Sequence, residues 1–352
     1  MSSSHKALSH KEELDSTQLF MSFDGLDSRL TKAVAKCGFV HPTLVQSKSI
    51  PLALAGKDLL VRARTGSGKT AAYSLPMLAK ILQEKGTGGG GGAGGAMIRG
   101  LVLVPTRELC QQVHRQIVEL TYYCKDFISV GDLGGGSSDA QRAVLQQRPD
   151  ILVTTPGRIV AHLTDADLVA SLKASVGTLV IDEADLVLSY GYEDDVRSVV
   201  RGIPRTCQTF IMSATLSEAL DDFRKVILHQ PVILRLEEGS SDGKLSQWFV
   251  STREGEKELV LYALLKLNLI QGKTLFFVNS VNSCYRLKLL FDQFSVQAAV
   301  VNAELPSNSR QHIIEEFNKG VFDFLIATDE VRACGGSCGV RVVFVFCGGA
   351  VV

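Results

Sequence analysis

Ala63-Arg-Thr-Gly-Ser-Gly-Lys-Thr70 is the stretch that decides how this sequence folds. Two glycines let the backbone curl so that its N–H groups point at phosphate oxygens. Lys69 has the length to reach the β- and γ-phosphates, and the Thr70 hydroxyl is placed to ligate a metal ion. The first position is alanine where the generic pattern has glycine. The loop predicts a nucleotide triphosphate site made by Ala63, Arg64, Thr65, Gly66, Ser67, Gly68, Lys69 and Thr70.

A second stretch, Leu179-Val-Ile-Asp-Glu-Ala-Asp185, reads as a buried strand that ends in acidic residues. Asp182 is expected to hold Mg²⁺ through water together with Thr70, and Glu183 to orient the attacking water. The alternative is a glycine-rich turn and an unrelated acidic helix start. The two stretches together favour an ATP and Mg²⁺ site in which Lys69, Asp182 and Glu183 are catalytic.

Length and composition describe the class of protein. A chain of 352 residues, with 45% apolar and 21% charged residues, is typical of a soluble globular protein with two domains. Lys+Arg and Asp+Glu balance at 37 each, which disfavours nonspecific binding to polyanions but allows a local basic groove. The sequence shows no membrane-length apolar run and no secretory signal at its start. Five scattered cysteines suggest reduced thiols inside a cell: Cys37, Cys110, Cys124, Cys207 and Cys284.

Short β-branched runs alternate with helical segments, which predicts an α/β fold with parallel sheets. In the first domain, at 21–240, we expect strands at 58–63, 100–105, 128–133, 150–155, 178–182 and 208–212, and helices at 70–85, 108–124 and 139–147. In the second, at 241–329, we expect strands at 248–252, 274–279, 298–302 and 324–329, and helices at 257–268, 283–294 and 309–318. Residues 1–20 are expected to be flexible, 86–96 to form a glycine-rich loop, 237–244 a linker, and 330–352 a divergent tail rich in Val, Gly and Cys.

The motifs resemble those of the DEAD-box RNA-dependent ATPases of helicase superfamily 2, over roughly residues 21–329. Within that family the chain looks most like nucleolar members that assist large ribosomal subunit assembly. The resemblance implies two RecA-like domains, the second incomplete. Phe23 and the run Gly38-Phe-Val-His-Pro-Thr-Leu-Val-Gln46 match the Q motif. The resemblance implies that Phe23 stacks on adenine, with core packing as the alternative role of this side chain. It also implies that the Gln46 carboxamide selects ATP over GTP.

The resemblance also assigns RNA-contacting loops and a coupling element. Ser213-Ala-Thr215 matches the element that links hydrolysis to strand separation, and its two hydroxyls are expected to bond the acids of 182–185. Arginines and strand-end N–H groups in the loops suit contacts to phosphate and sugar, which carry little base information. The RNA-binding candidates are Pro105, Thr106, Arg107, Gly134, Gly135, Thr155, Arg158 and, in the second domain, Arg310.

After Asp329 the sequence departs from the family. The resemblance implies Ala-Arg-Gly-x-Asp and later His-Arg-x-Gly-Arg-x-Gly-Arg, and residues 330–352 contain neither run. Arginine fingers of this kind are worth ~10³–10⁵ in turnover in related phosphoryl-transfer systems. We therefore expect a truncated and impaired helicase, and interpret the tail as translated intron or frameshifted sequence. Val340–Phe346 has the β character to fill a vacant strand position.

Three functions stay open on the sequence. The first is an ATP-dependent RNA helicase; the second is a catalytically weak module that binds ATP and RNA and competes with a full-length copy. The third is a DNA-directed motor of the same superfamily, which the Q motif disfavours. The subfamily resemblance further implies a nuclear, nucleolar location, pre-ribosomal particles as partners and no membrane.

Overall fold

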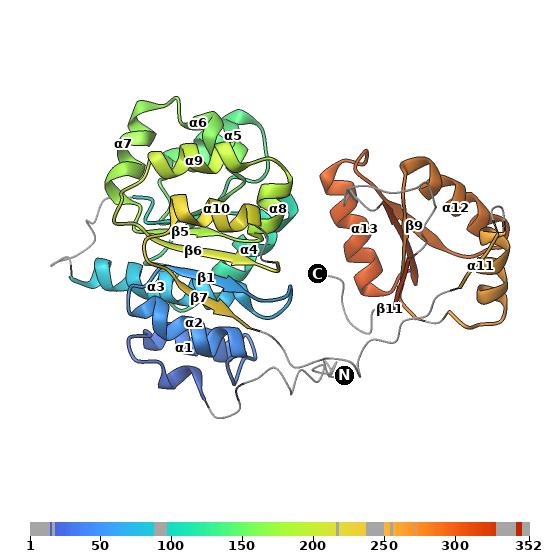
Figure 1. Ribbon diagram of the computed structural model, residues 1–352, viewed down its shortest axis with the longest axis horizontal. Coiled ribbons are helices and arrows are strands. Elements are labelled where there is room, and N and C mark those ends of the chain that lie inside the picture. Colours follow the sequence, from blue (N-terminus) through green and yellow to red (C-terminus); the bar gives the residue numbers. More distant parts are fainter. Residues whose placement is uncertain are drawn as a thin grey trace. The chain divides into compact units, whose positions relative to one another are not determined.

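The computed structural model describes residue 15 and residues 18–87, 97–215, 218–236, 250–253, 256–270, 272–328 and 343–346. These residues divide into two compact units, one before and one after the segment 237–249 (Figure 1). Most residues of the segments predicted to be irregular, namely 1–20, 86–96, 237–244 and 330–352, lie outside the described residues, so the predictions for them stay untested. Where these segments are described, Phe20 begins a 3-10 helix, Gly86 and Thr87 end a helix, and residues 343–346 form a strand.

The first unit is built on one seven-stranded sheet with the strand order β3-β4-β2-β5-β6-β1-β7, in which every pair is parallel. Six of its strands were predicted. The seventh, β7, was not, because it is a half-exposed edge strand of alternating burial rather than a continuous apolar run. The strands are β1 (Leu59–Arg62), β2 (Gly100–Leu103), β3 (Val130–Asp132), β4 (Ile151–Thr154), β5 (Thr178–Ile181), β6 (Gln208–Ser213) and β7 (Val232–Arg235).

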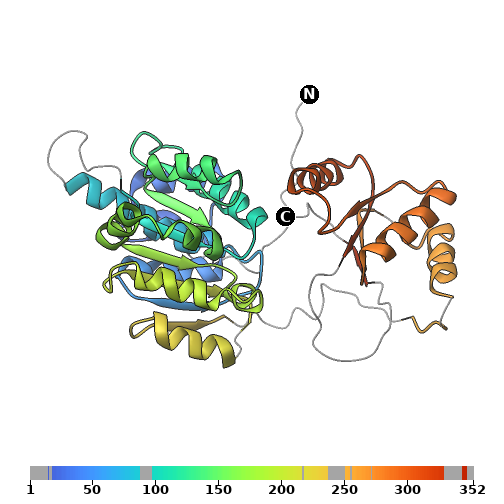
Figure 2. The ribbon, with the colours of Figure 1, turned by 90° about the horizontal axis from the view of Figure 1, so that it is seen from above.

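Helices cover both faces of this sheet, as Figure 2 shows. One core packs α1 (Ser28–Lys36), α2 (Leu44–Leu54), α3 (Lys69–Thr87) and α4 (Arg107–Leu120) against the sheet; a short 3-10 helix, η1 (Phe20–Ser22), joins it. The opposite core packs α5 (Ser138–Gln146), α6 (Pro156–His162), α7 (Ala166–Ser175), α8 (Ala184–Ser189), α9 (Glu193–Arg201) and α10 (Glu218–Ile227). Neighbouring strand residues enter opposite cores, such as Leu59 and Leu60, which is why the strands read as unbroken apolar runs.

The strand order sorts the loops at the carboxyl edge into two neighbouring groups. The nucleotide motifs follow β5, β6 and β1, which are adjacent in the sheet. The predicted RNA loops follow β3, β4 and β2, which are also adjacent. Parallel strands present their carboxyl ends at the same edge. The fold therefore places a candidate nucleotide site directly beside a candidate RNA surface.

The second unit contains a smaller sheet with the order β11-β8-β10-β9. Its strands are β8 (Thr274–Val278), β9 (Ala298–Val301), β10 (Phe324–Thr328) and β11 (Val343–Phe346). Helices α11 (Lys257–Lys266) and α12 (Val281–Gln293) contribute to one core, and α13 (Ser307–Lys319) contributes to another. The predicted strand at 248–252 is wrong for residues 250–252, which have no strand geometry; residues 248 and 249 are not described.

The prediction that a segment within 340–346 fills a strand position is confirmed, since β11 pairs with β8. It pairs antiparallel, whereas β8, β9 and β10 are mutually parallel. An antiparallel strand needs no crossover helix, unlike a parallel one. The second sheet is therefore mixed rather than wholly parallel. Among the described helices none has both the length and the apolar character to span a bilayer.

The second unit should open before the first under mild denaturant, because its cores are much smaller. In native-state hydrogen exchange, the amides of β8 and β10 should lose protection at a lower denaturant concentration than those of β1, β5 and β6. Loss of protection in all five strands at one denaturant concentration would contradict this.

Candidate functional site

The loop after β1 is shaped as an anion cradle. Gly66 and Gly68 have φ of +77° and +89°, in the left-handed region that favours glycine. A Cβ on Gly68 would also lie 2.5 Å from Nε2 of Gln46. The Ser67 hydroxyl donates to the Arg64 carbonyl at 2.8 Å and holds the curl. The loop ends at the N-terminus of α3, where free N–H groups and the helix dipole favour a phosphate.

The acidic residue at the end of β5 is buried beside the loop's lysine. Asp182 is 5% exposed, and its two oxygens accept from the Glu183 N–H and from the Tyr73 hydroxyl, both at 2.9 Å. Burial raises the pKa of the Asp182 carboxyl to about 6, against the opposing effect of Lys69. Lys69 is equally buried, with Nζ 3.1 Å from Oε1 of Glu183 and 3.2 Å from the Ala63 carbonyl oxygen. The predicted catalytic residues Lys69, Asp182 and Glu183 are thus brought together.

Glu183 has an unusual backbone. Its φ of +47° and ψ of +53° lie in the left-handed region, which a residue with a Cβ rarely adopts. Such a conformation costs on the order of 1–3 kcal/mol and persists only where the surroundings enforce it. Here β5 ends at Ile181, one residue before Asp182, and α8 begins immediately after Glu183. The turn holds the carboxylate next to Lys69 at the edge of the sheet.

The Q-motif glutamine is tied into the protein. Gln46 is 5% exposed; its Oε1 accepts from the Thr43 N–H at 2.9 Å, and its Nε2 donates to the Gly68 carbonyl at 3.1 Å. Thr43 caps the start of α2 in return, completing a reciprocal capping box. Gln46 therefore connects α2 to the phosphate loop, a role that the sequence analysis missed. The signal was present, because Thr-x-x-Gln is the capping-box pattern.

Phe23 lies in the core of the first unit. It is 7% exposed and packs edge-to-face on Phe20, with the ring centroids 6.0 Å apart. This placement supports the core-packing alternative over a ring that stands open for an adenine. Stacking of Phe23 on the base stays a prediction.

The predicted coupling element is half confirmed. The Thr215 hydroxyl and N–H both donate to Oδ2 of Asp185, at 3.0 and 3.1 Å. The prediction that Ser213 also bonds an acid of 182–185 is wrong, because its fully buried hydroxyl donates to the Thr215 carbonyl at 2.7 Å. Ser213 closes the turn, and Thr215 makes the link to the acidic helix start.

Side chains tie two of the three predicted RNA loops to each other. Gln141 on α5 is 3% exposed; its Nε2 lies 3.3 Å from the carbonyls of both Gly135 and Gly136, and its Oε1 lies 2.9 Å from Nε2 of His162 on α6. Because α6 begins at Pro156, this joins the loop after β3 to the loop after β4. The sequence analysis missed Gln141 and His162, since neither belongs to a motif that it used.

The predicted RNA loop after β2 leads into α4, and this helix packs against the predicted RNA loop after β3. A Cβ on Gly134 would lie 2.5 Å from Cβ of Cys110, which is on α4 just after Arg107. Thr106 caps α4 through a hydrogen bond from the Leu109 N–H at 3.3 Å. The close approach explains why glycine stands at 134.

The remaining RNA candidates differ in exposure. Pro105 and Thr155 are buried at the strand ends, Arg107 is exposed and Arg158 is half-buried. Arg310 is half-buried in the first turn of α13 in the second unit. The structure thus brings together the candidates of the first unit at one edge, with Arg107 offering its charge to solvent.

The donors at this edge fit ATP and Mg²⁺. Mg²⁺ prefers oxygen ligands, keeps several waters and is held by one or two protein groups plus phosphates. Asp182 and Thr70 supply such oxygens, and the curled loop with Lys69 supplies donors for phosphate. Within the described residues no three His, Cys, Asp or Glu side chains gather into a metal-binding cluster.

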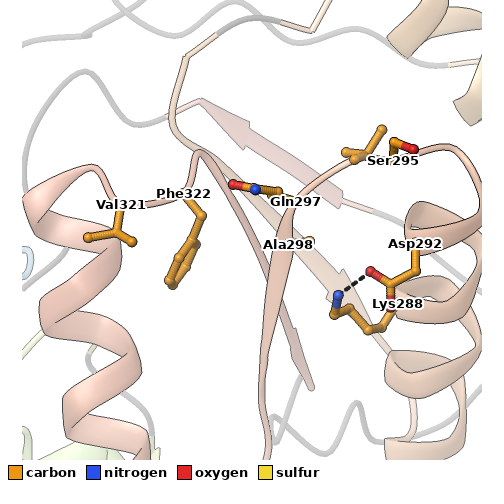
Figure 3. Close-up of a pocket in the computed structure, with 8 residues that line it drawn as sticks. Lys288, Asp292, Ser295, Gln297, Ala298, Val321 and Phe322 are labelled. Atoms are coloured by element: carbon orange, nitrogen blue, oxygen red, sulfur yellow. Dashed lines mark hydrogen bonds and ion pairs between the residues drawn. The ribbon is translucent and has the colours of Figure 1, made fainter.

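The second unit has a pocket of about 410 Å³ beside α12 (Figure 3). Gln297 and Ala298 at the start of β9, and Phe322 just before β10, line it together with the Lys288–Asp292 ion pair. These residues lie at the amino ends of the strands. Arg310, the predicted site residue of this unit, does not line the pocket.

Comparisons with known proteins agree with these observations. The DEAD/DEAH box helicase family model matches residues 43–223, and the helicase conserved C-terminal domain model matches residues 256–347. The second match passes Asp329, where the motif analysis expected the resemblance to stop. That expectation is corrected: the likeness continues through β11.

Similar proteins include curated helicases and solved structures. The chain is 48% identical over 310 residues to the probable ATP-dependent RNA helicase ddx56 of Dictyostelium discoideum, covering 87% of this chain and 44% of the relative. It is 47% identical over 324 residues to ATP-dependent RNA helicase dbp9 of Schizosaccharomyces pombe, covering 92% and 53%. The chain therefore spans about half the length of the curated relatives it matches.

Among solved structures, S. cerevisiae Dbp5 bound to RNA and ADP BeF3 matches with a TM-score of 0.72 and 25% identity, covering 86% of this chain and 74% of that one. A DEAD box protein from Methanococcus jannaschii matches with a TM-score of 0.54 and 25% identity, covering 90% and 82%. These likenesses agree with the predicted RecA-like α/β fold of two domains.

Lys69→Ala should weaken binding of a fluorescent ADP analogue with Mg²⁺ by at least roughly tenfold, because it removes a charged donor from the phosphate cradle. Glu183→Gln should change that affinity less than about threefold, since it removes a negative charge beside Lys69 but no proposed nucleotide contact. Fluorescence titration of both variants checks this. Equal weakening would show that Glu183 serves the shape of the site.

Gln46→Ala should narrow the preference for adenine over guanine nucleotides, since a carboxamide can both donate to and accept from the adenine edge. It should also weaken the binding of both nucleotides to a similar extent, because the Gly68 carbonyl in the phosphate loop loses its hydrogen bond from Gln46. Titration with ADP and GDP analogues separates the two effects. Thr43→Val, which loses the cap but keeps the Gln46 carboxamide, is the matched control; equal ADP and GDP affinities in the unsubstituted chain would contradict the selector role.

Proposed function

Because this chain belongs to the DEAD/DEAH box helicase family, we propose that it is an ATP-dependent RNA helicase polypeptide that couples an ATP and Mg²⁺ site to an RNA surface on the same sheet edge. The observation that supports it most is the buried Lys69–Glu183–Asp182 cluster facing the phosphate loop. A structural ion pair alone would not require the left-handed turn at Glu183.

Different residues of the first unit have different roles in the proposed hydrolysis. The loop N–H groups and Lys69 bind the phosphates, and Asp182 with Thr70 holds Mg²⁺. When bound, Mg²⁺ neutralises charge on the phosphate oxygens. Glu183 orients the attacking water and accepts its proton. Its ion pair with Lys69 at 3.1 Å means that both side chains must exchange partners when a nucleotide enters.

The nucleotide site is linked to the neighbouring loops by hydrogen bonds between residues that follow β5 and residues on or just after the two strands beside it. Thr215 bonds Asp185, in the helix that starts directly after Glu183, so a shift of this turn reaches the loop after β6. On the other side, Asp182 donates its N–H to the Leu103 carbonyl at 2.9 Å, at the end of β2 whose loop carries Arg107. We propose that the nucleotide state alters the RNA loops through these two connections.

RNA is the proposed partner, bound through its backbone. Arg107 and Arg158 offer charge for phosphate, and the Gly134–Gly135 segment allows close approach of a chain. The solved structure of a similar protein bound to RNA and ADP BeF3 supports the choice of RNA over DNA. Arg310 would contribute from the second unit.

The second candidate function is that of a module that binds ATP and RNA but hydrolyses ATP only slowly. Residues 330–352 lack the arginine-rich motif implied by the family, and β11 supplies a strand without that motif. We propose that residues 1–352 bind ATP and RNA but hydrolyse ATP slowly. The subfamily resemblance supports nucleolar pre-ribosomal particles as the place of action; localisation of the tagged chain tests that.

RNA should bind this chain and stimulate its ATP turnover, although weakly. Arg107→Ala should lower RNA affinity and reduce the salt dependence of binding by about one phosphate contact. Arg205→Ala is the matched control, since this exposed arginine precedes β6 at the opposite edge of the sheet. RNA affinity is measured by fluorescence anisotropy against salt, and turnover by phosphate release.

Four outcomes distinguish the proposed functions. RNA binding without turnover supports the slowly hydrolysing module, and fast unwinding abolished by Glu183→Gln supports a full helicase. Stimulation by DNA equal to that by RNA, or equal losses in Arg107→Ala and Arg205→Ala, would contradict the proposed RNA surface.

A further inference from the structure

Tyr73, which belongs to none of the motifs, contacts Asp182, the carboxylate that is proposed to hold Mg²⁺. Tyr73 is fully buried on α3, one turn after Thr70, and its ring packs in the core beneath the sheet. Its hydroxyl donates to Oδ2 of Asp182 at 2.9 Å. Residues three apart on a helix share a face, so Thr70 and the Tyr73 phenol point the same way. Burial and the neighbouring Asp182 raise the pKa of the Tyr73 phenol well above its usual value, against the opposing effect of the Thr70 side chain.

The Asp182 carboxylate is fixed from both sides. Oδ2 accepts from Tyr73, and Oδ1 accepts from the N–H of Glu183, both at 2.9 Å. A carboxylate oxygen has two lone-pair sites, so each oxygen keeps one site for a further donor. The rotation of the carboxylate is thereby set, and its free lone pairs have fixed directions. A phenylalanine would fill the same space but leave one oxygen unheld.

We propose that Tyr73 is a positioning residue for Mg²⁺, which orients the Asp182 carboxylate toward the waters of the ion from the helix that also carries Thr70. This rests on the proposed function, since it deepens the role of the same site. Partners of this kind, which hold a metal-binding group rather than the metal, typically change metal affinity when removed.

Tyr73→Phe is the test, because it deletes the hydroxyl and keeps the ring. A fluorescent ADP analogue is titrated into the full chain in EDTA and at increasing Mg²⁺. Affinity in EDTA should stay within about twofold, while the Mg²⁺ concentration for half-maximal tightening should rise roughly tenfold. Thr121→Val is the matched control: it removes a buried hydroxyl, bonded to the Val118 carbonyl at 2.9 Å, far from the motifs along the chain.

A double-variant cycle shows whether Tyr73 acts through Asp182. In an Asp182→Asn background, Tyr73→Phe should leave the remaining Mg²⁺ dependence unchanged. An equal effect in both backgrounds would overturn the proposal. So would a Tyr73→Phe chain that is no more altered in Mg²⁺ dependence than Thr121→Val, or one that fails to fold, since the phenol would then serve the core alone.

The proposed function is tested by the unsubstituted chain in the same experiment. Mg²⁺ should tighten ADP binding relative to EDTA. Absence of that difference contradicts the nucleotide site itself and the role of Tyr73 with it. A normal difference that Tyr73→Phe does not alter overturns the role of Tyr73 only.

Discussion

Burial of a parallel sheet on both faces is the constraint on which the first unit depends. Apolar side chains from alternate positions of β1, β2, β4, β5 and β6 fill two opposite cores, and most polar side chains of these strands stand at their ends, such as Gln208 and Ser213 in β6. Polar groups therefore gather where the strands end. The strand order then decides the neighbours: motifs far apart in the chain meet because β1, β6 and β5 are adjacent, and the RNA candidates meet because β2, β4 and β3 are adjacent.

The charged side chains at the carboxyl edge of this sheet are fixed in position by ion pairs with one another and by hydrogen bonds to the backbone. Lys69 is nearly buried and is paired with Glu183, and Asp182 is buried between a phenol and an amide. Removing one partner from such a cluster leaves an uncompensated buried charge, which is costly. The cluster therefore has a defined geometry before any ligand enters, and preorganised groups of this kind are effective in phosphoryl transfer. Gln46 extends the same ordering to the loop through the Gly68 carbonyl.

Much of the fold was predictable, and the misses have physical reasons. Five central strands of the first unit were predicted because they are largely apolar and buried, and the edge strand β3 was predicted as part of 128–133. The edge strand β7 was missed because it is half-exposed, and a strand at 250–252 was wrongly expected from β-branched residues that pair with nothing described. Ser213 was expected to bond an acid, but the tight turn directs its hydroxyl to the Thr215 carbonyl. The likeness to the family also continued past Asp329, where motif spacing alone indicated an end.

The sequence by itself determined the class of fold and predicted the chemistry of the candidate nucleotide site, because the glycines of the loop, its lysine and the acids after β5 would act through local geometry and residue type. Only the tertiary structure decided which side chains hold that chemistry in place. Tyr73, Gln141 and His162 carry no motif, and their partners lie on other elements. Hydrogen bonds between distant segments depend on how helices pack on the sheet, and spacing along a chain does not encode that packing in a readable form.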